Sequence, residues 1–204
     1  MAKSKKGVRK SGRGRGRNAR ERLPAVRDAI ALLKADHHQV REWFEEFQSA
    51  RSSARKQVLA GQICEALKVH TQVEEELFYP AFLAATGEVA IHHEAEVEHN
   101  GAKRLIDEIG SSAAQDDYFD AKVTVLAEMI RHHVNEEEKR DGMFAKARQS
   151  DMDLAGLGQR LASRKAELTG MMEAGEEEPA SRSTGSSSAN RRSSGGVARL
   201  AKRD

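Results

Sequence analysis

Apolar side chains recur at alternating steps of three and four residues along four segments of the chain, which is the period of an amphipathic helix. Pro80 is expected to end or kink the second helix, and Gly110, which two serines follow, is expected to end the third. The four stripes are Ile30, Leu33, His37, Val40, Phe44 and Phe47; Leu59, Ile63, Leu67, His70, Val73 and Leu77; His92, Glu96, His99, Ala102, Ile106 and Ile109; and Val123, Leu126, Ile130, His133 and Glu137, with Phe144 after an interruption at Arg140.

Four helices of about 20–30 residues with short connections predict an all-α fold, an up-down-up-down four-helix bundle whose core is built from these stripes. No segment shows the alternating pattern of a strand over any length. A fifth amphipathic stretch predicts an extra C-terminal helix that packs outside the bundle, with the leucines Leu154, Leu157, Leu161 and Leu168.

Charge is distributed very unevenly along the 204 residues. The whole chain carries a formal charge of +2, residues 1–22 carry +9 and residues 179–204 carry +5, so the part between them carries −12. Both ends lack side chains that could build a core, and no burial would offset the entropy of ordering them. We therefore predict a disordered basic tail over 1–22, one helical domain over 23–172 and a disordered Ser/Gly/Arg-rich tail over 173–204.

The composition also limits location and partners. No apolar run reaches the roughly 18 residues of a membrane span, and no apolar segment of a secretory signal follows the basic start, so we expect a cytoplasmic protein without membrane contact. One Cys beside eight His argues against disulfides and zinc-thiolate sites. The tails either solubilise the protein or bind nucleic acid non-specifically, and the candidate phosphate contacts are Lys5, Lys6, Arg9, Lys10, Arg13, Arg15 and Arg17.

Each of the four long stripes includes one mid-helix histidine: His37, His70, His99 and His133. Glu74 and Glu137 follow two of them one turn later on the same face. To bury imidazoles and carboxylates with nothing to satisfy them would cost several kcal/mol, and a cation removes that conflict. The sequence thus predicts a metal site inside the bundle.

Imidazole and carboxylate ligands without thiolate suit iron, manganese or zinc, and carboxylates that can bridge two ions favour a dinuclear centre. If two six-coordinate ions share both carboxylates and a bridging oxo or hydroxo group, about two coordination positions stay open or hold water. An open position is what dioxygen, peroxide or nitric oxide would need.

The motif order resembles the hemerythrin-like HHE cation-binding domain over roughly residues 26–170. This resemblance implies a non-haem di-iron centre with His37, His70, His99 and His133 as ligands and the two glutamates as bridges, with iron favoured over manganese or zinc. It also implies a protein that binds O2, peroxide or NO, either to sense the ligand or to detoxify an oxidant by catalase-like or peroxidase-like turnover. The phrases that carry the resemblance are LLKADHHQV, LKVHTQVEEELFYPAF, AEVEHNGAKRLIDEI and HHVNEEEKRDGMFAKAR.

One position departs from the pattern of oxygen-carrying hemerythrins, which have two His four residues apart on the third helix. Ala95 stands where the partner of His99 would be, so strict oxygen carriage is not expected. Glu96 or His92 could complete the coordination or hold a ligand imidazole by its second nitrogen. Glu96 is favoured because seven residues of helix rise about 10 Å, too far for His92 to share an ion with His99.

Residues beside the proposed ligands are expected to be ordinary surface. Glu75, Glu76, Glu136 and Glu138 point away from the stripes. Asp36 directly precedes His37 and could accept a hydrogen bond from a ligand histidine, but an exposed acid is the favoured expectation. We identify no Tyr or Trp on a stripe close to the ligands.

Two other functions remain open. A ferritin-like di-iron oxidase needs Glu-x-x-His on two helices, and the stripes offer only Glu96-x-x-His99. An interaction bundle that binds nucleic acid through its tails could instead hold a metal for stability alone.

Overall fold

The computed structural model describes residues 28–176, and the part of the chain that it describes contains helices and no strand. The all-α prediction is confirmed. The basic residues from Lys5 to Arg17 lie outside the described residues, as does the C-terminal tail beyond Glu176. The elements are α1 (Ala29–Ser49), α2 (Ser53–Val73), the π-helical turn η1 (Glu74–Phe78), α3 (Tyr79–Thr86), α4 (Val89–Gly110), α5 (Phe119–Glu138), α6 (Met143–Gln149) and α7 (Leu154–Glu176).

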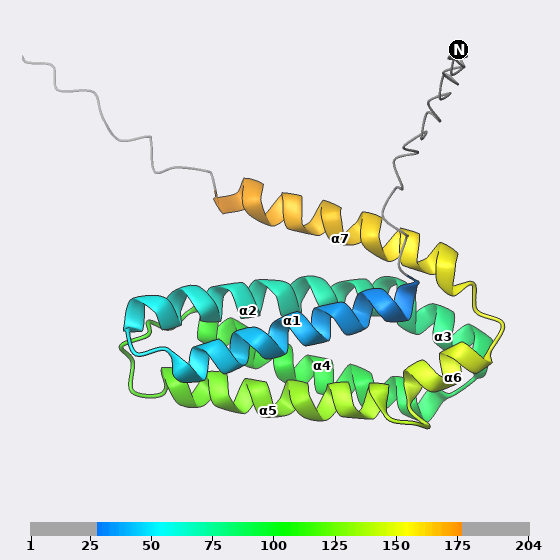
Figure 1. Ribbon diagram of the computed structural model, residues 1–204, viewed down its shortest axis with the longest axis horizontal. Helices are drawn as coiled ribbons and strands as arrows, with labels where there is room; N and C mark the ends of the chain where they lie inside the picture. The colour runs from blue at the N-terminus through cyan, green and yellow to red at the C-terminus, as the bar shows by residue number, and fades with distance from the viewer. Residues whose placement is uncertain (1–27, 177–204) are drawn as a thin grey trace, which may run out of the picture.

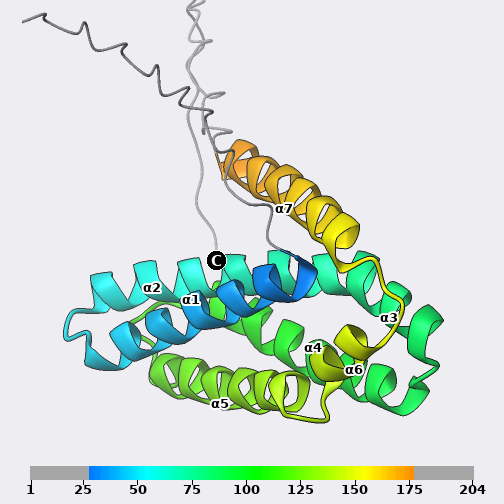
Figure 2. The ribbon, with the colours of Figure 1, turned by 45° about the vertical axis from the view of Figure 1, so that its right-hand side comes forward.

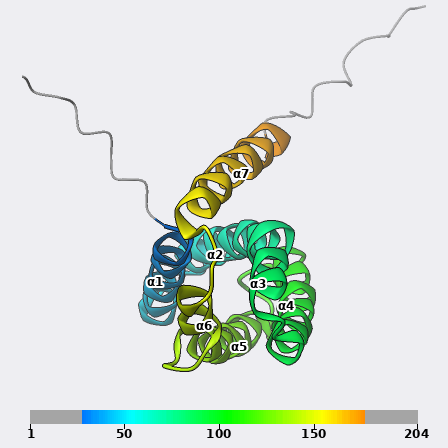
Figure 3. The ribbon, with the colours of Figure 1, turned by 90° about the vertical axis from the view of Figure 1, so that its right-hand side faces the viewer.

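Helices α1, α2, α4 and α5 run alternately up and down and form the four sides of the bundle (Figure 1). Helix α1 contacts α2 and α5, and α4 contacts the same two helices. The end-on view accordingly shows the four helices around a common interior (Figure 3). Asp28 caps α1 by accepting a hydrogen bond from the Ala31 amide, and Ser52 caps α2 in the same way. The predicted four-helix bundle is confirmed.

Helix α7 lies outside the bundle, across α1 and α2 (Figure 2). Leu157, Leu161 and Leu168 are buried on its inner face, which confirms the predicted extra helix. Its last residue, Glu176, lies four residues beyond the expected domain boundary at 172. Within residues 28–176, no helix combines the length and the apolar character needed to cross a membrane.

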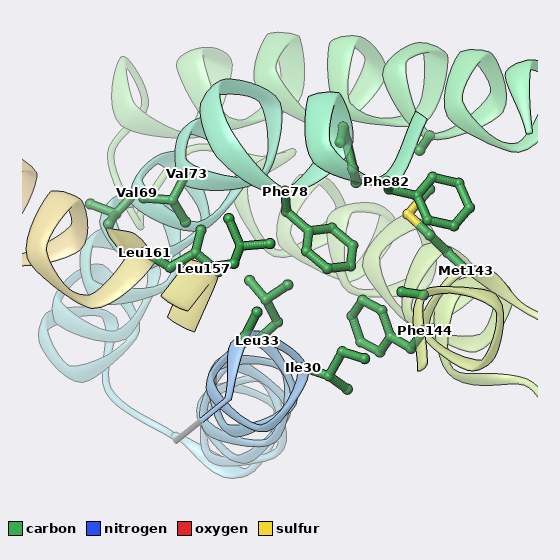
Figure 4. Packing of buried hydrophobic residues seen from close by; sticks show 14 of the residues in the cluster. Ile30, Leu33, Val69, Val73, Phe78, Phe82, Met143, Phe144, Leu157 and Leu161 are labelled. Atoms are coloured by element: carbon green, nitrogen blue, oxygen red, sulfur yellow. The ribbon is translucent and has the colours of Figure 1, made fainter. Parts of the chain in front are cut away.

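The apolar core forms two clusters, one toward each end of the bundle. Figure 4 shows the first cluster, in which Leu157 and Leu161 of α7 lie beside Val69, and Phe78 packs against Phe144. The second includes Val40, and helix α1 passes from one cluster to the other with His37 between Leu33 and Val40. A polar layer therefore separates the two clusters at mid-bundle.

The second predicted helix changes its register before Pro80. Helix α2 ends at Val73, and in the turn that follows the Tyr79 amide donates to the Glu74 carbonyl, five residues back instead of four. The extra residue turns the side chains that follow, so Leu77 is only half-buried, whereas Phe78 and Tyr79 are fully buried. The helix does not end at Pro80, because α3 continues through it to Thr86, and the irregularity is the π-helical turn that precedes Pro80. The buried position predicted for Leu77 is wrong.

Candidate metal centre

Six polar side chains meet in the layer between the two apolar clusters, and all six are buried. The four long helices each supply one histidine, and the glutamates come from η1 and from the last turn of α5. These residues are His37, His70, Glu74, His99, His133 and Glu137.

The histidines are arranged as two pairs. The Nε2 atoms of His37 and His70 lie 3.0 Å apart, and those of His99 and His133 lie 3.1 Å apart. The first pair joins α1 to α2, and the second pair joins α4 to α5. The four Nε2 atoms therefore gather at two points inside the bundle.

Each glutamate lies between the two histidine pairs. One oxygen of Glu74 is 3.2 Å from His70 Nε2 and 3.4 Å from His99 Nε2. One oxygen of Glu137 is 3.5 Å from His37 Nε2 and 3.7 Å from His133 Nε2. Each of the two carboxylates therefore has one histidine of each pair within 4 Å.

The outer nitrogen of every one of these imidazoles faces a carboxylate. His37 Nδ1 donates to Glu138 at 2.9 Å, His99 Nδ1 to Glu75 at 3.0 Å and His133 Nδ1 to Glu98 at 2.7 Å. His70 Nδ1 lies 3.5 Å from Asp36. In the three hydrogen-bonded imidazoles, the proton held on Nδ1 leaves Nε2 to present its lone pair to the interior.

Three of these outer carboxylates were expected at the surface, and that expectation is wrong. Glu75 and Glu138 are about two-thirds buried or more and Asp36 is largely buried. Lysines balance their charge from outside: Lys103 contacts Glu75, Lys34 contacts Glu138 and Lys165 of α7 contacts Asp36. The hydrogen bond from His99 holds the pKa of Glu75 down, at about 2, so this carboxylate is an ionised acceptor.

A bound cation would give these buried nitrogen lone pairs and carboxylate oxygens a partner. Nε2 lone pairs face each other at 3.0 Å, and Glu74 Oε1 and Glu137 Oε2 are buried without a hydrogen-bond partner in the described part of the chain. Burial raises the pKa of Glu74 well above its ordinary value, and the charge of Glu137 adds to the shift. Burial also lowers the pKa of His70 to about 3, which keeps its imidazole neutral, the form that binds metals.

The donor set can be grouped around two ions that share Glu74. His37, His70 and Glu74 form one group and Glu74, His99 and His133 form the other, with donor atoms within 4.8 Å of one another in each. Nitrogen and oxygen donors without sulfur suit iron, manganese or zinc. The free thiol of Cys64 is buried in the second apolar cluster and takes no part in either group.

Tyr79 and the outer carboxylate Glu98 are site residues that the sequence did not reveal, and Tyr79 lies among the inner donors. Its hydroxyl lies 3.1 Å from His99 Nε2, 3.2 Å from Glu137 Oε1 and 3.5 Å from Glu74 Oε2. The π-helical turn brings residue 79 to the face of Glu74, whereas a regular α-helix would bring residues 77 and 78 there. The expectation that no tyrosine lies near the ligands is wrong, and the phenol oxygen is a further donor on the His99–His133 side.

The structure does not bring Glu96 and His92 to the six inner side chains. The Glu96 side chain is 49% exposed and meets His92 Nδ1 at 3.6 Å on the outside of α4. Ala95 faces inward instead, because a stripe through residues 95, 99, 102, 106 and 109 alternates steps of four and three, whereas 96, 99 and 102 repeat steps of three and drift around the helix. The His92 side chain is 14% exposed, and its ring meets that of Tyr79 edge-on, with centroids 5.9 Å apart.

The exposure of Glu96 also removes the support for a ferritin-like centre. That arrangement needs inward Glu-x-x-His pairs, and the pair at 96–99 has only its histidine inside. Helix α1 supplies a histidine to the layer where ferritin-like proteins supply a glutamate.

Comparison with known proteins gives three matches. Residues 28–145 match the family model of the Hemerythrin HHE cation binding domain. A protein described as a DNA nickase from Nostoc sp. strain PCC 7120 is 31% identical over 107 residues, which cover 52% of this chain and only 30% of that protein. The crystal structure of a Hemerythrin HHE cation binding domain-containing protein from Mycobacterium kansasii superposes with a TM-score of 0.62 at 22% identity, over 74% of this chain and 94% of that one.

Proposed function

The chain belongs to the hemerythrin HHE cation-binding domain family, and on that premise we propose that it is a non-haem di-iron protein that binds O2, peroxide or NO. The ligand set would be His37, His70, His99 and His133, with Glu74 and Glu137 as bridges. The observation that carries the proposal is the position of the two carboxylates, each between two converging histidine pairs.

Iron held by these residues would supply redox chemistry and an exchangeable position for a small oxidant. The protein's own groups would do the rest. The outer carboxylates fix the imidazoles with Nε2 inward, and the two apolar clusters keep bulk water away from the layer. The Tyr79 hydroxyl, 3.2 Å from Glu137, is placed to hold a proton beside the ligand and to return it.

Both sensing and oxidant detoxification fit this arrangement. In a sensor, the bound ligand would change the charge between helices that the site joins. In an enzyme, the centre would turn over hydrogen peroxide, and Tyr79 would serve the proton transfers. A steady-state assay of peroxide decay separates the two, because only the second role requires turnover.

Adjacent histidines on α1 provide a matched test of the ligand set. His37 faces the centre, whereas the His38 side chain is exposed and lies 3.6 Å from Glu42 on the outside of α1. We expect the purified iron-replete protein to hold about two iron atoms per chain with near-ultraviolet absorption from bridged iron. His37→Ala should lose both and His38→Ala should retain both. Iron well below this amount in the wild type, or equal loss in the two variants, would contradict the proposal.

A second function has support of its own. The +9 and +5 charges of residues 1–22 and 179–204 favour contact with a polyanion, and a relative is described as a DNA nickase. In this role the bundle would bind nucleic acid through its tails. Binding to duplex DNA should weaken by about a thousandfold or more between about 50 and 200 mM salt if six or more phosphates are contacted. It should fall steeply when residues 1–22 are deleted, and salt-independent binding would contradict it.

A further inference from the structure

A cavity of about 200 Å³ opens on the surface between α4, α5 and the turn that leads into α6. His133 and Glu137 of the metal centre form part of its wall. We propose that this cavity, which we call the α4–α5 port, is the route by which divalent metal ions reach the centre. The proposal rests on the proposed function, because it needs a centre that binds metal.

The inner end of the port presents a buried carboxylate, that of Glu137. Glu137 is 2% exposed, and its Oε2 has no hydrogen-bond partner within residues 28–176. Glu98 lies between this point and the surface: one of its oxygens accepts from His133 Nδ1, and the other lies 3.2 Å from the exposed His132. A cation that entered here would find carboxylate oxygen at each stage of its path.

The outer rim is acidic. Glu94 and Asp141 are exposed, and neither has an ion-pair partner among the described residues. Glu136 is paired with Lys139, and Lys146 is paired with Glu88. A cleft that carries an excess of one charge raises the local concentration of ions of the opposite charge, so this rim favours cations over anions.

Small residues keep the port open. Ala95, which is 4% exposed, and Gly142 both form part of its wall. Neither position places a large side chain between the rim of the port and the metal centre. On the other side of α5, a cavity of about 280 Å³ reaches His37, but Arg41 and Arg131 form part of its wall. Two guanidinium groups oppose the approach of a cation, so the acidic port is the favoured route of the two.

Metal uptake by the metal-free protein tests the port without any assay of oxidant chemistry. Co2+ is the probe, and its visible absorption in stopped flow reports binding to the nitrogen and oxygen donors. Glu94→Gln with Asp141→Asn should slow uptake at low salt by about threefold to tenfold and leave the final stoichiometry unchanged. Lys139→Gln should accelerate uptake, since it removes a cation from the same rim.

Glu45→Gln provides the matched control, because Glu45 is an exposed carboxylate at the arginine-containing cavity. It should load at the wild-type rate, and about 0.5 M salt should remove the differences between the variants. Uptake by the double variant at the wild-type rate, or equal slowing by Glu45→Gln, would overturn the port. A wild-type protein that binds no Co2+ at His37 and His133 would instead refute the proposed function, and the port with it.

Discussion

Tyr79 brings a phenol hydroxyl into a buried group of imidazoles and carboxylates, where it contacts His99 and Glu137. Tyr79→Phe keeps the ring packed and removes only the oxygen. In the metal-free protein this leaves buried polar atoms without a partner, so the free energy of unfolding should fall by about 1–3 kcal/mol. If Tyr79 transfers protons, peroxide decay by the iron-loaded variant should slow by about 100-fold.

Urea unfolding and stopped-flow peroxide decay measure the two effects separately. Tyr118→Phe is the control, because that side chain is 74% exposed and makes no contact with the centre. Wild-type stability and wild-type turnover in Tyr79→Phe would show that the hydroxyl has neither role.

Glu75 tests whether the outer carboxylates tune the metal ligands. It accepts the hydrogen bond of His99 Nδ1, while its neighbour Glu76 points outward and pairs with Arg164. Glu75→Gln removes the charge that orients this imidazole and increases its basicity, so metal affinity should fall by about 10–100-fold. Glu76→Gln should leave affinity unchanged. Competition with a chelator of known affinity measures both, and equal losses would contradict the role of Glu75.

The helical period was sufficient to predict the six inner donors as a set, because each lies at a stripe position and its neighbours, such as His38, do not. It could not reveal Glu75, Glu98 or Glu138, because they lie next to a ligand in sequence and about 100° away around the helix. For the same reason it offered Asp36 only as an alternative to an exposed acid. Their role depends on the facing helix, where the imidazole that they contact is located. Spacing within one helix carries no information on that contact.

Gly142 shows how the turn after α5 fixes a ligand at the helix end. A Cβ at this position would lie 2.3 Å from the Glu136 carbonyl oxygen and 2.8 Å from that of Glu137. Gly142→Ala must therefore move the turn or the end of α5, and we expect a loss of about 1–3 kcal/mol of stability together with weaker metal binding.

Thermal unfolding and metal titration of Gly142→Ala test this element. Gly61→Ala is the control, because a Cβ there meets nothing within 4 Å and alanine favours the interior of a helix by up to about 1 kcal/mol. Metal affinity in Gly142→Ala equal to that of Gly61→Ala would show that the close approach does not position Glu137.

The long helices were predictable because a single period runs through each of them, as in α1, where all six stripe residues are buried. The turn η1 could not be predicted in this way. One inserted residue leaves the local composition unchanged and alters only which side chains face inward. Pro80 marked the interruption, but the choice between a break and a π-helical turn depends on whether Phe78 and Tyr79 gain burial in the bundle. That choice is made by tertiary packing.

At the scale of the whole molecule, metal and proton compete for the same buried layer. In the metal-free protein, the folded-state pKa of His70 is about 3, below its ordinary 6.5, because of burial, so unfolding takes up a proton and stability is lost as pH falls from 6.5 toward 3. Glu74 acts in the opposite direction: burial raises its pKa, so protonation of the folded state restores stability as pH falls toward 4.5. These two effects oppose each other above about pH 4.5. Below it, the loss from His70 continues, and Glu75 and Glu138, whose pKa values lie at about 2, add to it.

The metal-loaded protein cannot use the compensation from Glu74, because a carboxylate that binds a cation stays ionised. Its stability should therefore fall more steeply than that of the metal-free protein as pH decreases through about 6 to 5, where imidazoles begin to take up protons and release the metal. Melting temperatures at pH 7, 6, 5 and 4, measured with and without a chelator, test this. The two curves should be far apart at pH 7 and should meet near pH 5. A separation that stays constant down to pH 4 would mean that the stabilising metal is not bound through these histidines.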